Sequence, residues 1–189
     1  DVICIDEMPT KKLNLIAFSN GIYDINENKL LDFDPNIIIT NKIPWDYNPN
    51  AYSELVDGVL DRLSCDDKDI RRCLEEVAGA CFYRSATIGG GKCAVLLGNK
   101  ANGKSTYLHM LESMIGDSNY TSLDIAELKL RFNTVMLFGK LANFGDDISS
   151  DYIADTSVIK KMATGESVKV EKKGQDPFIF TPYATHIFS

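Results

Sequence analysis

The stretch Gly98–Ser105, with the sequence GNKANGKS, is the most informative part of this chain. It matches G-x-x-x-x-G-K-[ST] in full, a pattern typical of a phosphate-binding loop between a buried strand and a helix. The apolar run Cys93–Leu97 predicts that strand, and apolar residues at helical spacing predict a helix over about Lys104–Ile115. A bare glycine turn is the alternative, but it does not explain why Lys and Ser stand at the required positions.

Each part of the loop has a chemical role. The glycines let the backbone curl so that N–H groups point at phosphate oxygens, and the following helix N-terminus adds to this anion site. Lys104 would place its ammonium group on the β- and γ-phosphates of ATP, and Ser105 would offer its hydroxyl to Mg²⁺, with Thr106 as a substitute. The predicted nucleotide-binding residues are Gly98, Asn99, Lys100, Ala101, Asn102, Gly103, Lys104, Ser105 and Thr106.

A phosphate-binding loop needs an acidic partner at the end of a neighbouring strand to hold Mg²⁺. The stretch Leu137–Phe144 contains another predicted strand, and Asp146 and Asp147 follow it. We assign Asp146 to the magnesium ion and Asp147 to the attacking water as general base, with the reverse assignment as the alternative. With Lys104, these are the predicted catalytic residues. The competing interpretation is that the two acids only cap the next segment.

A third element is a predicted hairpin with a basic tip. Alternating apolar residues at Val168–Val170 and Phe178–Phe180 flank Lys172 and Lys173. Two exposed lysines on a projecting loop can follow a phosphate backbone without reading its sequence. Taken alone, the same pattern also fits a solvated hairpin that binds nothing.

The chain before the loop has a different character. Residues 13–33 predict a β-hairpin, and a short strand is predicted at Ile37–Thr40. Two helices follow, with apolar faces over residues 52–63 and 70–82. We therefore predict a small mixed, mainly helical domain, and after it an α/β domain with a central parallel sheet. The predicted domains are residues 1–84 and 85–189.

Composition narrows the function classes. Of the 189 residues 44% are hydrophobic, which excludes a disordered chain. The net charge of −7 argues against a protein that binds nucleic acid through bulk positive charge, but it allows a local basic element. No apolar run approaches the roughly 20 residues of a membrane span, so no membrane partner is expected. The 5 cysteines form no Cys-x-x-Cys pair, which favours reduced thiols in an intracellular protein.

These elements, in this order, resemble the superfamily-3 helicases of viruses, phages and plasmids, a branch of the AAA+ ATPases. The likeness is strongest to the helicase part of phage and plasmid primase-helicases. It rests on the loop Gly98–Ser105, on ANFGDDIS at 142–149, on IKKMATGE at 159–166, on the lysine hairpin, and on ATHIFS at 184–189. Upstream, FSNGIYD at 18–24 looks like part of the small domain that precedes the ATPase in this family.

The resemblance implies a P-loop AAA+ ATPase core in an ATP-dependent DNA helicase, which couples ATP hydrolysis to movement along single-stranded DNA. It implies a homo-oligomer, a hexameric ring in the full-length protein, with ATP and Mg²⁺ bound between subunits. It allows a fused primase domain, whose presence the sequence leaves open, and it implies a location in the cytoplasm of a bacterial host. The DNA contacts carried over from the family are Lys169, Lys172 and Lys173.

The same resemblance predicts what the end of the chain lacks. In that family an asparagine that senses the γ-phosphate follows the last strand, and an arginine finger comes later. The sequence reaches Ser189 where that asparagine is due. We therefore expect an AAA+ core that is truncated at its C-terminal end and that binds nucleotide better than it hydrolyses it.

Two other functions stay open at this point. A P-loop small-molecule kinase would use the same loop, but such kinases usually carry an arginine-rich lid, and Arg131 is the sole arginine after the loop. A nucleotide-binding assembly module without catalysis would keep the nucleotide as a structural element.

Overall fold

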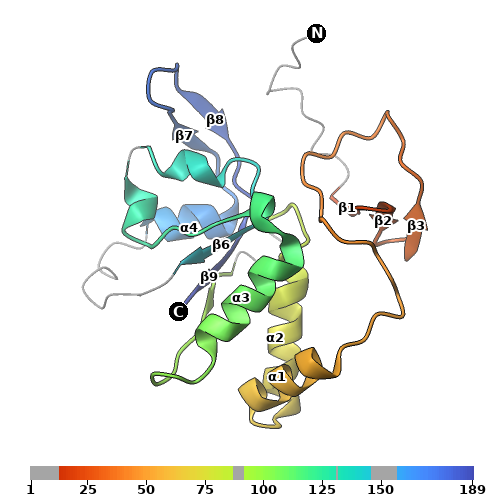
Figure 1. The fold of residues 1–189 in the computed structure, drawn as a ribbon. Helices are drawn as coiled ribbons and strands as arrows, with labels where there is room; N and C mark the ends of the chain where they lie inside the picture. Colours follow the sequence, from red (N-terminus) through yellow and green to blue (C-terminus); the bar gives the residue numbers. More distant parts are fainter. Residues whose placement is uncertain (1–12, 87–91, 131, 146–156) are drawn as a thin grey trace.

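The computed structural model describes residues 13–86, 92–130, 132–145 and 157–189, and Figure 1 shows their arrangement. The helices are α1 (Glu54–Ser64), α2 (Lys68–Ala80), α3 (Lys104–Ile115) and α4 (Ser157–Thr164), with short 3-10 turns η2 (Asp117–Asn119), η3 (Glu127–Lys129) and η4 (Thr134–Leu137). The strands are β1 (Leu15–Phe18), β2 (Gly21–Asp24), β3 (Lys29–Leu31), β4 (Ala94–Val95), β5 (Tyr120–Thr121), β6 (Ala142–Gly145), β7 (Val168–Val170), β8 (Phe178–Phe180) and β9 (Thr185–Phe188). Within these ranges no helix is long and apolar enough to cross a membrane.

Strands β1, β2 and β3 form an antiparallel sheet, which confirms the predicted N-terminal hairpin. Glycine is required at the turn because a Cβ atom on Gly21 would lie 2.5 Å from the carbonyl oxygen of Leu31 in β3. The strand predicted at Ile37–Thr40 is wrong. The carboxylate of Asp34 accepts a hydrogen bond from the amide of Asn36 (2.9 Å) and turns the chain, and irregular structure follows.

The two predicted N-terminal helices are confirmed as α1 and α2, and side-chain caps define their starts. Ser53 caps α1 by accepting a hydrogen bond from the amide of Val56, and Asp67 caps α2 in the same manner. Between the helices, Cys65 and Asp66 take left-handed backbone conformations. This short reversal lets the two helices pack against each other.

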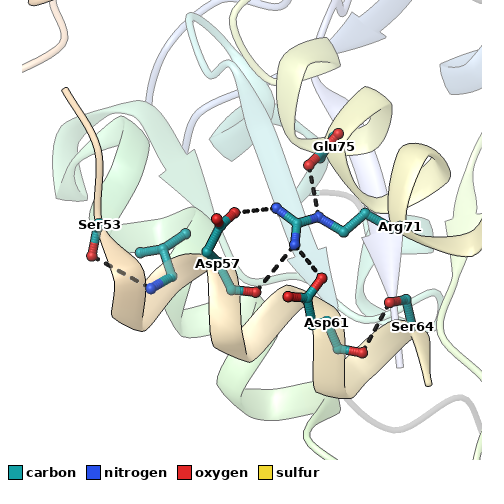
Figure 2. A network of polar contacts seen from close by, with 7 residues as sticks. Ser53, Asp57, Asp61, Ser64, Arg71 and Glu75 are labelled. Carbon is teal, nitrogen blue, oxygen red and sulfur yellow. Dashed lines mark hydrogen bonds and ion pairs between the residues drawn. The ribbon is translucent and has the colours of Figure 1, made fainter. Parts of the chain in front are cut away.

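One guanidinium group fixes α1 to α2 (Figure 2). Arg71 of α2 pairs with the carboxylates of Asp57 and Asp61 on α1, and with Glu75 one turn further along α2 (2.9 Å). The same group donates to the main-chain carbonyl of Asp57 (3.2 Å). The hydrogen bond from Arg71, followed by that from Tyr52, lowers the pKa of the Asp57 carboxyl below its ordinary value.

A second sheet has the strand order β4-β9-β6-β5, and each neighbouring pair in it is parallel. The last strand in sequence, β9, therefore lies between β4 and β6. Phe188 of β9 pairs with Val95 of β4 on one side and with Gly145 of β6 on the other. Glycine is needed at 145 because a Cβ atom there would lie 2.5 Å from the Phe188 ring. The carboxyl ends of these three strands thus meet at one edge of the sheet.

Side chains on the two faces of this sheet enter different buried clusters, because neighbours along a strand point to opposite faces. Ile187 of β9 packs in the cluster that contains Leu111 and Ile115 of α3. Phe188 packs in the other cluster, which contains Leu137 of η4 and Met162 of α4. The sheet is therefore covered on both faces, as parallel strands require.

The first cluster draws residues from both predicted domains. Ile43 from the N-terminal part is buried in it together with Tyr107 of α3. Next to Ile43, the buried amide of Asn41 donates to the carbonyl of Gly139 (2.6 Å) and accepts from the hydroxyl of Tyr183 (2.8 Å). The division into two domains stays a prediction, and these contacts tie the two parts together.

We expect the Arg71→Met variant to unfold at a lower temperature than the wild type near neutral pH, because Asp57 and Asp61 lose their shared partner. Since the pKa of Asp57 is lowered in the folded protein, its charged form stabilises the fold above the ordinary value of about 3.9. That contribution is lost as the pH falls through the lowered pKa. The difference between variant and wild type should therefore shrink in acid, as thermal unfolding followed by circular dichroism can measure.

The matched control is Arg72→Met. Arg72 pairs with Glu76 (2.8 Å), and both side chains are exposed. Such pairs contribute little to stability. An equal fall in melting temperature for the two variants would contradict the role given to Arg71.

Candidate nucleotide-binding site

The loop Gly98–Ser105 leaves β4 and enters α3, which begins at Lys104 as the sequence predicts. Gly103 is the N-cap residue of α3 and has no side chain that could accept a hydrogen bond from the first turn. The amide groups of that turn are therefore left for a ligand, and the helix dipole favours a negatively charged one. Residues 98–102 are exposed to solvent.

Two backbone conformations shape the loop. Gly103 has a φ of +89°, and a Cβ atom there would lie 2.5 Å from the side chain of Leu63 at the end of α1. Both facts require glycine. Ala101 has a φ of +58° although it carries a Cβ atom, a conformation that costs about 1–2 kcal/mol. Helix α1 therefore supports the loop at the point where α3 begins.

The ammonium group of Lys104 lies folded onto the loop. Its Nζ donates to the carbonyl oxygens of Gly98 (3.1 Å) and Asn99 (3.2 Å) and to Oδ1 of Asn102 (3.2 Å). These three acceptors match the three donors of a lysine ammonium. The ammonium group of Lys104 therefore lies against the loop and pairs with loop oxygens. A bound phosphate would take the place of these oxygens.

The two predicted hydroxyl ligands lie in the first turn of α3. Ser105 and Thr106 are both exposed to solvent, and their role as magnesium ligands stays a prediction. The predicted acidic partners, Asp146 and Asp147, lie outside the described residues, as does Arg131. Their assignment as magnesium ligand and general base stays a prediction.

The described part of the sheet brings the two halves of the predicted site to one edge. The strand before the acidic pair, β6, ends at Gly145, level with Phe188 of β9. On the other side of β9, the amide of Leu96 donates to the carbonyl of Phe188 (2.8 Å). Neighbouring strands lie about 4.8 Å apart, so the end of β6 is roughly 10 Å from the chain that enters the phosphate loop.

The hairpin with the basic tip is confirmed, with β7 and β8 antiparallel. Phe138 anchors its base by packing edge-on against Phe178 and Phe180, with ring centroids 5.4 and 5.3 Å apart. Val170 points to the protein and is buried. The predicted DNA-binding residues Lys169, Lys172 and Lys173 are all exposed.

The hairpin and the phosphate loop lie at opposite ends of the molecule. The contact between Gly103 and Leu63 places the loop beside α1, and Figure 1 shows α1 at the far end from β7 and β8. The structure therefore separates the predicted DNA-binding lysines from the predicted nucleotide-binding residues.

Within the described residues, the other polar side chains form no second candidate for a functional site. No group of His, Cys, Asp or Glu side chains within them could hold a metal ion. His186 is buried in β9, and burial lowers the pKa of its imidazole to about 4, which keeps it neutral. His109 is on the surface of α3, where it contacts Glu112 (2.8 Å).

Two residues that shape the loop, Asn102 and Leu63, could not be identified from the sequence. The pattern G-x-x-x-x-G-K-[ST] sets no requirement at Asn102, so its contact with Lys104 could not be predicted from the motif. Helical periodicity marks Leu63 as part of an apolar face, but it does not say what covers that face.

Two family models match parts of the chain. Residues 3–79 match the family described as "D5 N terminal like". Residues 96–189, which include the phosphate loop, match a "Family of unknown function (DUF5906)". No curated protein was found that matches the chain.

Solved structures of the NrS-1 C-terminal region have a similar fold. The A form apo structure of region 305–718 matches with a TM-score of 0.56 at 19% identity, over 72% of this chain and 32% of that one. Another apo structure of the same region matches with a TM-score of 0.56 at 19% identity, over 95% of this chain and 41% of that one. The chain thus spans less than half the length of these structures. At this level of identity the likeness shows a shared fold.

Proposed function

We propose that this chain is the ATPase part of a phage or plasmid primase-helicase, an ATP-dependent DNA helicase of the superfamily-3 type with a P-loop AAA+ core. The main support for the proposal is the glycine loop at the edge of a parallel sheet. Lys104 stands at the start of α3, and its ammonium group donates hydrogen bonds to this loop. The D5 N terminal like match and the fold shared with the NrS-1 C-terminal region also support it.

The nucleotide would bind through the chain's own donors. The phosphates accept hydrogen bonds from the loop amides and from Lys104, which exchanges its loop partners for phosphate oxygens. Ser105 and Asp146 would hold Mg²⁺, since it prefers oxygen ligands. The metal would neutralise charge on the phosphates. Asp147 would orient the attacking water and accept its proton.

DNA would bind at the other end of the molecule, on the hairpin. Lys172 and Lys173 stand at its tip, where they can pair with successive phosphates of a single strand. Phe180 of the hairpin packs against the cluster that contains Phe188, and Phe188 pairs with Val95 of β4, shortly before the phosphate loop. A shift of β9 during hydrolysis would therefore move the base of the hairpin.

The resemblance to superfamily-3 helicases also implies an oligomer on DNA. In this proposal the full-length protein forms a homo-oligomeric ring, a hexamer, with ATP and Mg²⁺ at the subunit contacts and single-stranded DNA in the centre. A primase domain fused to the helicase part would supply primers on the same DNA.

The Lys104→Ala variant should lose most of its affinity for ATP. Removing the charged donor takes away a charge-assisted hydrogen bond, which corresponds to roughly 10- to 100-fold weaker binding. Isothermal titration with Mg²⁺ present measures this, and Lys92→Ala, an exposed lysine before the loop, is the control. Unchanged ATP binding by Lys104→Ala would refute the nucleotide site.

The double variant Lys172→Ala, Lys173→Ala should bind single-stranded DNA more weakly while it binds ATP like the wild type. With two phosphate contacts gone, the slope of log affinity against log salt should fall by about 1.4. Fluorescence anisotropy with a labelled oligonucleotide at several salt concentrations measures both quantities.

The matched control is Lys160→Ala, Lys161→Ala, which removes two exposed lysines from α4 and changes the net charge equally. Equal losses in both double variants would indicate general charge attraction and not a hairpin site. Full DNA affinity in the hairpin variant, with ATP binding intact, would favour the assembly module over the helicase.

A further inference from the structure

The side chain of Asn102 is folded into the phosphate loop. Its Oδ1 accepts a hydrogen bond from Nζ of Lys104 (3.2 Å). Its amide nitrogen lies over Gly98, 1.8 Å from where a Cβ atom would stand. The carboxamide therefore spans the loop from its first glycine to its lysine, although the motif requires no particular residue at this position.

The three oxygens that accept hydrogen bonds from Lys104 are of two kinds. Two are main-chain carbonyl oxygens, of Gly98 and Asn99, and these belong to the loop whatever its side chains are. The third is the side-chain oxygen of Asn102, which a substitution can remove. A phosphate needs the same ammonium donors, so Asn102 and the phosphate compete for Lys104.

The geometry points to Asn102 as a positioning residue that holds Lys104 folded onto the loop and that a bound phosphate must displace. This inference rests on the proposed function, since it requires that the loop bind a nucleotide. The loop must then release Lys104 before the phosphates can engage it. Observed affinity is the intrinsic affinity reduced by the fraction of molecules in which that release has occurred.

Two substitutions at this position should act in opposite directions. Asn102→Ala removes the competing acceptor, so the association rate constant should rise and the dissociation constant should fall, by roughly three- to tenfold. Asn102→Asp places a carboxylate on the ammonium and repels the phosphates, so binding should slow and weaken by about tenfold or more. A residue that merely stabilises the loop would weaken binding in both variants.

Stopped-flow mixing with a fluorescent ATP analogue and Mg²⁺ separates the two rate constants. The expected result for Asn102→Ala is faster association with an unchanged dissociation rate, because the displaced side chain does not contact the bound nucleotide. Weaker binding by Asn102→Ala, or a change confined to its dissociation rate, would overturn the inference. Circular dichroism confirms that each variant is folded.

The Lys104→Ala variant, measured in parallel, separates this inference from the proposed function. If Lys104→Ala loses nucleotide binding while Asn102→Ala behaves as the wild type, the site stands and the role of Asn102 fails. If Lys104→Ala binds the analogue as tightly as the wild type, the nucleotide site itself is refuted.

Discussion

The position of β9 between β4 and β6 sets the arrangement of the parallel sheet. Its parallel pairing with both neighbours aligns Leu96, Phe188 and Gly145 across one edge of the sheet. That edge receives the phosphate loop from β4 and precedes the acidic pair after β6. A one-residue slip of β9 would turn Ile187 and Phe188 to the wrong faces and remove each of them from its buried cluster.

The loop is supported from outside the sheet as well. Arg71 holds α1 against α2, and Leu63 at the end of α1 fills the space beside Gly103 where a larger residue would place its Cβ. The N-terminal helices therefore help to shape the proposed nucleotide site and do more than precede it. Ile43 in the shared buried cluster extends the same connection to the N-terminal sheet.

Local sequence patterns predicted where helices and strands lie, but they did not predict which of these elements pair or pack together. The motif fixes the start of α3 at Lys104, and alternation of apolar residues locates both strands of the hairpin. The sequence could not show the order of the parallel strands, because pairing of β9 with β4 joins residues about ninety positions apart. Periodicity also placed Leu55 on a buried face, yet it is 75% exposed, since a pattern marks a face but does not supply what covers it.

We propose that the loop from Gly98 to Ser105 binds ATP with Mg²⁺, and hydrogen exchange of its backbone amides can detect this binding. With saturating ATP and Mg²⁺, amides of residues 98–106 should exchange more slowly, because phosphate oxygens accept their hydrogen bonds. At the same ATP concentration the Lys104→Ala variant should show much weaker protection. Unchanged exchange in the loop of the wild type under these conditions would refute a nucleotide site there.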